Sequence, residues 1–167
     1  MKKPLFKKGF TLIELIIVIA IIAVLASAVF IAIDPARRLN ESRNARRWSD
    51  VENVLSSIVT YQADNGGVHY STVASATAGT YYQIGTAATG CNTGCGAVTT
   101  ANACVDLSAI GSNYLATVPY DPKTGTAAKS DYYIMKDTNG AITIGACDPE
   151  GTGAGGAGAA PVIRLTR

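Results

Sequence analysis

The stretch KKGFTLIELIIVIAIIAVLA, Lys7–Ala26, decides the architecture, because it sets a single carboxylate, Glu14, in a long apolar run. From Leu12 to Ile33, Glu14 is the only charged residue and Ser27 the only other polar one. An ionised carboxylate at the centre of a bilayer-spanning helix costs about 2.5–3.5 kcal/mol on insertion scales. Glu14 is therefore a candidate functional residue.

The apolar run is long enough to cross a membrane. Leu15–Ile33 contains 19 residues, close to the ~20 that a helix needs to span a bilayer. The hydrophobic region of a secretory signal is usually shorter, about 7–15 residues, and ends in a small-residue cleavage site. Asp34-Pro35 follows the run instead. We therefore expect a retained membrane helix, with any cleavage before it.

Positive charge is concentrated ahead of the apolar run. Four lysines precede it: Lys2, Lys3, Lys7 and Lys8. The net charge of the 167-residue chain is +2, and loss of these lysines would change it to −2. The basic balance thus belongs to the N-terminal segment and gives little support for nucleic-acid binding. By the positive-inside rule, the lysines weakly favour a cytoplasmic N-terminus.

All four cysteines follow the apolar run: Cys91, Cys95, Cys104 and Cys147. An even number of cysteines on an exported side predicts disulfides, for which three fully paired connectivities remain open. Zinc is disfavoured because the chain offers a Cys-x3-Cys spacing and a single histidine, His69. We expect no metal site.

The sequence after the apolar run predicts an amphipathic helix. Asp34 is a good N-cap and Pro35 is tolerated in a first turn, so we expect a kink or a restart there. The residues expected to face a core form one stripe: Trp48, Val51, Leu55 and Ile58. The residues expected to face water are polar or charged: Arg43, Arg46, Arg47, Asp50, Glu52 and Asn53. With a stop at residues 64–67, the whole helix would span about 55 residues, or ~80 Å.

The rest of the chain predicts a small head with three or four antiparallel strands. The expected strands are residues 81–84, 131–136, 141–146 and 162–166. Asn139-Gly140 predicts a type I′ hairpin turn, and Gly151–Gly158 a flexible spacer. The tyrosine pairs at 81–82 and 132–133 are expected to alternate between core and surface. The predicted fold class is α+β, with a long N-terminal helix, transmembrane in its first half, packed on this sheet.

The N-terminal residues resemble those of type IV prepilins and of type II secretion pseudopilins. The resemblance consists of a basic leader ending in Gly9, the aromatic Phe10, Thr11-Leu12-Ile13, then Glu14 and the apolar run. It continues more weakly through DPARRLNESRNARRWSDVENVLSSIVTYQADNGG, YLATVPYDP and the closing hairpin. It implies a pilin fold with a cleaved leader at 1–9, a membrane and filament-core helix at 10–34, its amphipathic half at 35–65 and a head at 66–167.

The resemblance also implies roles for three residues. A prepilin peptidase would cut between Gly9 and Phe10 and methylate the new amine of Phe10. Glu14, one helical turn later, would attract the Phe10 amine of a neighbouring subunit and set the register of assembly. From the residues alone, Glu14 could equally interact with its own helix N-terminus, for about 0.3–1 kcal/mol, or with its own chain's amine.

The implied function is structural, as a subunit of a type IV pilus-like filament. The expected partners are other copies of the chain, the prepilin peptidase and an inner-membrane assembly machine. A secretion pseudopilin, a minor pilin that adheres or takes up DNA, and an anchored domain that never polymerises are the alternatives. The precursor would cross the inner membrane once with its N-terminus in the cytoplasm, and then join an extracellular pilus or periplasmic pseudopilus.

We expect no catalytic residues and no cofactor. The G-x-G-x-x-G match at Gly151–Gly156 lacks a βαβ context, and His69 has no evident catalytic partners. A calcium site like that of major pseudopilins could recruit Asp121, Asp131 and Asp137, but their spacing matches no calcium loop. The arginines between residues 37 and 47 alternate with acids, which favours ion pairs between subunits or a solvated face.

Overall fold

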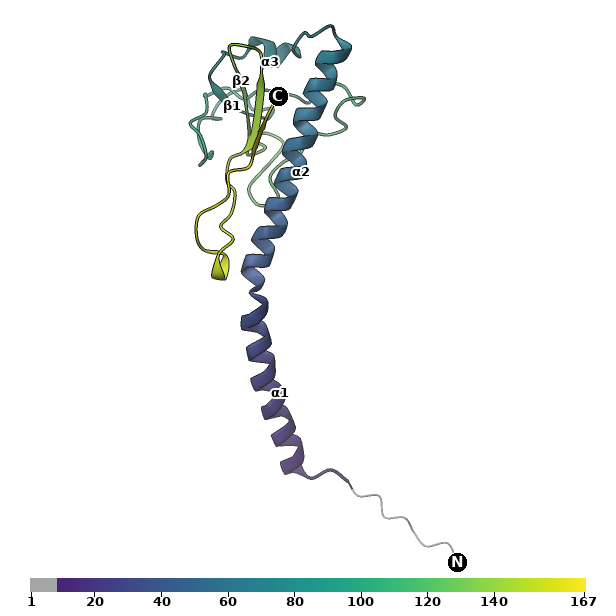
Figure 1. Cartoon of the computed structure of the whole chain (residues 1–167), viewed down its shortest axis with the longest axis vertical. Coiled ribbons are helices and arrows are strands. Elements are labelled where there is room, and N and C mark those ends of the chain that lie inside the picture. Colours follow the sequence, from purple (N-terminus) through teal and green to yellow (C-terminus); the bar gives the residue numbers. More distant parts are fainter. Residues whose placement is uncertain (1–8) are drawn as a thin grey trace, which may run out of the picture.

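The computed structural model describes residues 9–167 and shows two consecutive helices with a head packed along the second (Figure 1). Helix α1 spans Leu12–Ile33 and helix α2 spans Pro35–Asp64. No residue of α1 is buried against the described chain, whereas α2 buries one side against the head. The predicted α+β class is confirmed. The four leader lysines lie outside the described residues.

A four-stranded antiparallel sheet forms the head, in the order β1-β2-β3-β4. The strands are β1 Tyr81–Gln83, β2 Tyr132–Lys136, β3 Ile142–Ala146 and β4 Arg164–Thr166. A short helix α3, Ser71–Ser75, and a 3₁₀ turn η1, Ala154–Gly156, complete the elements of the described chain. The core lies between the sheet and α2, where Val51, Leu55 and Ile58 meet Ile142 and Ile144.

Asp34 separates the two helices and restarts the second. Its backbone is left-handed (φ 47°, ψ 71°), a conformation that aspartate tolerates better than most residues. Its Oδ1 accepts the N–H of Arg37 at 3.3 Å and so caps α2. Pro35 follows at the first helical position, where its missing N–H leaves no intrahelical bond unmade. The expected kink or restart is therefore a one-residue interruption.

The glycine-rich segment Gly151–Gly158 is not the flexible spacer that its composition predicts. It packs against the start of α2, beside the helix junction (Figure 1). The N–H of Gly155 donates to Oδ2 of Asp34 at 2.7 Å, and Asn40 Nδ2 donates to the Gly151 carbonyl at 2.8 Å. A Cβ on Gly156, which has φ 76°, would lie 2.7 Å from the Asn40 amide. The glycines thus permit a close approach, and the segment forms a strap across the junction.

The β2–β3 turn also differs from its prediction. Gly140 donates its N–H to the Asp137 carbonyl at 3.0 Å, so Thr138 and Asn139 are the central residues of the turn. Only Gly140 in this turn has positive φ, 84°. A type I′ turn needs positive φ at both central residues, so that prediction is wrong.

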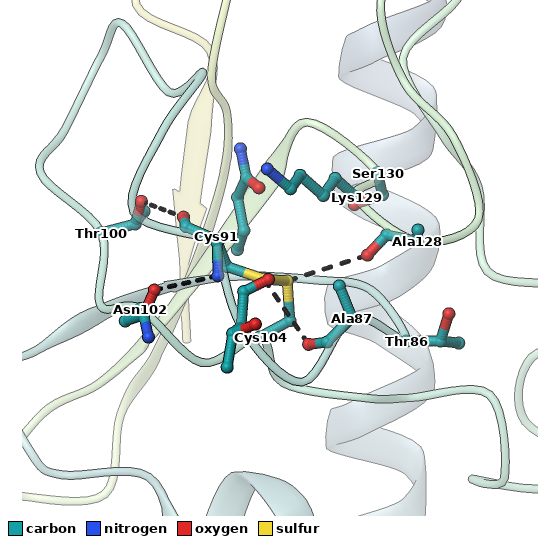
Figure 2. The surroundings of a disulfide bond; sticks show 12 residues. Thr86, Ala87, Cys91, Thr100, Asn102, Cys104, Ala128, Lys129 and Ser130 are labelled. Carbon is teal, nitrogen blue, oxygen red and sulfur yellow. Dashed lines mark hydrogen bonds between the residues drawn. A yellow bond between two sulfur atoms is a disulfide. The ribbon is translucent and has the colours of Figure 1, made fainter.

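Two disulfides pin the long loop between β1 and β2, which confirms that the cysteines pair. Cys91 bonds to Cys104 within the loop, and Cys95 bonds to Cys147 at the end of β3. Around the first bridge, the Cys91 N–H donates to the Asn102 carbonyl and Thr100 donates to the Cys91 carbonyl (Figure 2). The loop is therefore fixed to itself and to the sheet.

Two residues of α2 depart from the predicted helical faces. Arg47, expected to face water, is 0% exposed, and Trp48, expected in the core, is 40% exposed. The spacing explains Arg47, since it precedes Val51 by four residues and Val54 by seven and so lies on the buried side. Trp48 lies at the edge of that side, beside Leu165 and Arg167.

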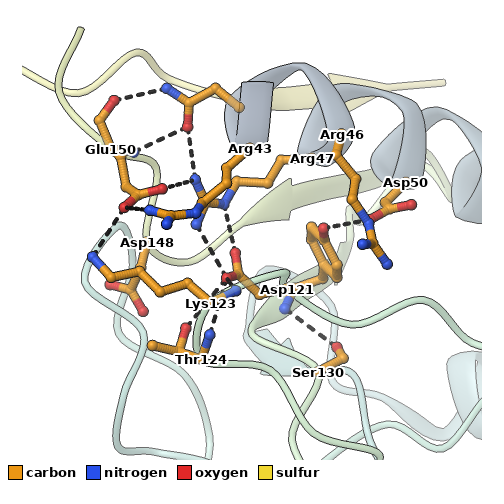
Figure 3. Close-up of polar contacts among 12 residues, drawn as sticks. Arg43, Arg46, Arg47, Asp50, Asp121, Lys123, Thr124, Ser130, Asp148 and Glu150 are labelled. Atoms are coloured by element: carbon orange, nitrogen blue, oxygen red, sulfur yellow. Dashed lines mark hydrogen bonds and ion pairs between the residues drawn. The ribbon is translucent and has the colours of Figure 1, made fainter. Parts of the chain in front are cut away.

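Arg47 is buried because two carboxylates from the head surround it (Figure 3). Its Nε and second terminal nitrogen donate to both oxygens of Asp121, at 2.5 and 3.1 Å, and its first terminal nitrogen reaches Glu150 at 3.1 Å. Asn44 accepts from Arg47 at 2.8 Å and exchanges two hydrogen bonds with the Glu150 backbone. Burial alone would raise the pKa of Asp121, but hydrogen bonds from Arg47 and from the Lys123 N–H outweigh it and lower that pKa.

Replacing Arg47 by methionine should destabilise the head by about 3–5 kcal/mol, because Asp121 and Glu150 would keep their burial and lose their shared cation. The lowered pKa of Asp121 means that its contribution is present above the unfolded pKa of about 4 and is lost as the pH falls. The variant should therefore lose less stability than the parent between about pH 5 and 3. Urea unfolding of the full chain in detergent, followed by Trp48 fluorescence at several pH values, measures both effects.

Arg46→Met is the matched control. Arg46 is a neighbouring, exposed arginine whose nearest carboxylate, Asp50, is 3.7 Å away. Its replacement should change stability by less than about 1 kcal/mol. Equal losses for the two variants would contradict the role given to the buried cluster.

Candidate functional site

The candidate site is the N-terminus of α1, where Thr11 and Glu14 form a capping box. Thr11 is the N-cap, and its hydroxyl accepts the Glu14 N–H at 3.3 Å. In return, Oε2 of Glu14 accepts the Thr11 N–H at 2.7 Å and the Thr11 hydroxyl at 2.9 Å. The Glu14 carboxylate and the Thr11 hydroxyl thus each accept one backbone N–H at the start of the helix, and the carboxylate lies at the positive end of the helix dipole.

Gly9 and Phe10 lie ahead of this cap and are exposed. Phe10 is 91% exposed, and apart from the chain neighbours of Gly9, no atom of the described residues lies within 4 Å of the place where a Cβ on Gly9 would stand. Because the helix begins at Leu12, Phe10 lies outside it. The expectation that Glu14 follows Phe10 by one helical turn concerns the processed subunit and stays a prediction. The Gly9-Phe10 bond stands in an open, non-helical segment.

Beyond the cap, α1 presents apolar side chains on all sides. Large aliphatic residues and Phe30 along its length are about half to three-quarters exposed. In the described chain, one helical segment, which begins at Leu12, is long and apolar enough to cross a membrane. Ser27 donates its hydroxyl to the Val24 carbonyl at 2.8 Å, so the polar group in mid-run is satisfied within the helix. This is the condition that a lipid environment imposes on a spanning segment.

The family model of the prokaryotic N-terminal methylation motif matches residues 6–30. The chain carries the signature of type IV pilins and pseudopilins. The matched span contains Gly9, Phe10 and Glu14 and ends within α1, and it supports a pilin-like or pseudopilin precursor anchored in a membrane. No curated protein and no solved structure matched the chain.

The other candidate residues have structural surroundings. Asp121 binds Arg47, and Asp137 accepts the N–H of Thr138 within the hairpin turn at 2.7 Å. His69 Nδ1 lies 2.6 Å from the Gln62 amide nitrogen, and burial lowers the pKa of this histidine. Across residues 9–167, no three potential metal ligands of the His, Cys, Asp or Glu type gather in one place.

Sequence reasoning missed the partner of Glu14 inside its own chain. Thr11-Leu12-Ile13-Glu14 has the form Thr-x-x-Glu before an apolar run, which is the sequence signature of a capping box. That signal was available in the sequence. It gives Glu14 a role in the uncleaved chain, as part of the cap that begins α1.

Replacing Thr11 by valine should destabilise the start of α1. Valine keeps the branched shape but lacks the hydroxyl that accepts the Glu14 N–H and donates to the Glu14 carboxylate. The expected cost is about 1 kcal/mol, the usual value of an N-cap. Hydrogen exchange at the first-turn amides of the full chain in nanodiscs measures this cost, and Thr11→Ser is the control that should retain protection. Equal protection in the valine variant would show that the capping box does not hold the helix start.

Proposed function

We propose that this chain is the precursor of a structural subunit of a type IV pilus-like filament. The observation that carries the proposal is an apolar helix of 22 residues that buries none of them against its own described chain and carries one carboxylate in its first turn. Such a surface needs lipid before assembly and neighbouring helices afterwards. The methylation motif over residues 6–30 supports the same function.

Processing would convert the candidate site into an assembly site. A prepilin peptidase hydrolyses the Gly9-Phe10 bond, which leaves a carboxylate on Gly9 and an amine on Phe10, and the amine is then methylated. The exposure of both residues supports access by the enzyme. The new N-terminus carries a positive charge only one residue before the Thr11 cap.

Glu14 would then have three candidate partners: its own Thr11, the Phe10 amine of its own chain and the Phe10 amine of a neighbouring subunit. In an apolar filament core, opposite charges attract far more strongly than in water, and either charge alone is costly. An ammonium group is therefore a stronger partner for Glu14 than a neutral hydroxyl. Docking at the position that supplies the amine would set the stagger between subunits.

The disulfides support the proposed location. Structural disulfides form on the exported side of a bacterial membrane and are rare in the cytoplasm. Both bridges lie in the head, so the head would lie outside the inner membrane and the leader lysines inside it. Because the α1 surface is already out of water in the bilayer, its transfer to a filament gains little hydrophobic energy. An energy-driven assembly machine is therefore an expected partner.

Replacing Glu14 by alanine should lower filament yield at least about tenfold while leaving leader cleavage intact, because the Gly9-Phe10 bond is unchanged and the charged partner is lost. The expected factor corresponds to the 1.5–3 kcal/mol of a charged hydrogen bond. Filaments sheared from cells expressing each variant are quantified, and mass spectrometry of the subunit should find a methylated N-terminus at Phe10.

Thr11→Val is the matched control, since it disrupts the cap and keeps the charge of Glu14. It should assemble much better than Glu14→Ala. Unchanged yield in Glu14→Ala would exclude the register role. Processed subunits without any filaments in the parent strain would instead favour a pseudopilin or a non-polymerising anchor.

A further inference from the structure

The outer face of the sheet holds a row of three directly paired residues. Tyr133 on β2 is paired with Gly145 on β3, and Gly145 is paired with Arg164 on β4. Directly paired residues in antiparallel strands point to the same face of a sheet. A Cβ on Gly145 would overlap the tip of the Tyr133 ring, so the tyrosine lies across β3 toward Arg164. Gly145 therefore brings a phenol and a guanidinium together.

These two groups line a hollow of about 480 Å³ on that face. One wall comes from residues 96–98, held by the Cys95–Cys147 bridge, and the other from residues 160–164. Between the polar groups the lining is apolar, with Val98, Pro161 and Val162. The volume is within the range of ligand pockets, whose usual composition is an apolar lining with a few placed polar groups.

Both polar groups lack a protein partner. Tyr133 is 2% exposed and lines the hollow, and its hydroxyl makes no hydrogen bond with any residue between 9 and 167. Arg164 forms no ion pair within the same residues. Burial raises the pKa of Tyr133, and the charge of Arg164 opposes that rise, so the phenol is a neutral donor beside a cation. The Tyr133 hydroxyl is therefore free to donate a hydrogen bond to a molecule in the hollow.

We propose that this hollow binds a small carboxylate with an apolar body. Its carboxylate accepts hydrogen bonds from the Arg164 guanidinium and the Tyr133 hydroxyl, and its body lies against the walls of the hollow. A guanidinium fork matches the two oxygens of a carboxylate, which favours this group over a single-atom acceptor. The site is distinct from the α1 surface and does not depend on filament assembly.

Asp148 limits the ligand to one negative charge. Its carboxylate also lines the hollow, and its Oδ1 accepts the Gly96 N–H at 3.1 Å. A like charge disfavours a bound anion, so a dicarboxylate would be repelled at this position. Removing the charge of Asp148 while keeping its acceptor should therefore strengthen binding of a monocarboxylate.

The probe is 4-fluorobenzoate, titrated into the full chain in nanodiscs and followed by its fluorine NMR signal, with empty nanodiscs as the blank. Binding should saturate, and Arg164→Gln should weaken it about tenfold or more, the factor expected for a hydrogen bond to a charged group. Tyr133→Phe should weaken it about threefold to tenfold, the range for a single hydrogen bond. The neutral analogue 4-fluorobenzyl alcohol should bind weakly and equally to all variants.

Two further variants separate binding from folding. Arg167→Gln removes the same charge from the residue that follows β4, outside this hollow, and should bind as the parent does. Asp148→Asn should bind 4-fluorobenzoate more tightly, a gain that partial unfolding would not produce. No saturable binding above the blank, or equal affinity in Arg164→Gln and the parent, would overturn the proposal and leave the Tyr133 hydroxyl to water alone.

Discussion

The structure depends on the need to cover α1. Its 22 residues bury nothing against the described chain, and Glu14 is the one charge among them. Every exposed Å² of this apolar surface costs about 25 cal/mol in water, so the chain needs either lipid or other copies of the helix around it. The Glu14 carboxylate lies in the first turn of α1, where its hydrogen bonds with Thr11 and the helix dipole stabilise it. After processing, the Phe10 amine of a neighbouring subunit would be a stronger partner.

The head is attached to α2 by polar anchors as well as by a core. Arg47 joins α2 to Asp121 and Glu150, and the strap at Gly151–Gly158 joins the Asp34 junction to the head. Breaking such a buried pair leaves an uncompensated charge, which makes the anchor specific to one arrangement. The same carboxylate that restarts the helix at Asp34 also receives the strap. The start of α2 is therefore tied to the head at Asp34, Asn40 and Arg47.

Much of this fold could be predicted because patterns of neighbouring residues indicate its helices and their buried faces. The apolar run predicted α1, Asp34-Pro35 the restart, and the stripe through Val51 and Ile58 the buried side of α2. The charge of Arg47 predicts a side chain that faces water. Its spacing of four residues from Val51 nevertheless places it on the buried side of α2. The strap was missed because glycines that predict flexibility also permit close packing. The disulfide pairing depends on three-dimensional distances, such as the approach of Cys95 to Cys147, which local patterns do not contain.

The residues of the candidate site and one of its contacts could be predicted from the sequence. Gly9, Phe10 and Glu14 could be named from the motif, and the Thr-x-x-Glu pattern before an apolar run indicates the bond from Glu14 to Thr11. The proposed carboxylate site in the head contains Tyr133 and Arg164. It could not be predicted from the sequence, because the register of β2, β3 and β4 brings these two residues together. The two sites lie on separate parts of the chain.

A cryo-electron microscopy map of the assembled filament, at a resolution that places side chains, tests the central claim most directly. In this map the Glu14 carboxylate should lie within hydrogen-bond distance of the methylated Phe10 amine of a neighbouring subunit, with α1 helices packed around the filament axis. A Glu14 carboxylate that still binds only its own Thr11, with neighbouring amines elsewhere, would contradict that claim.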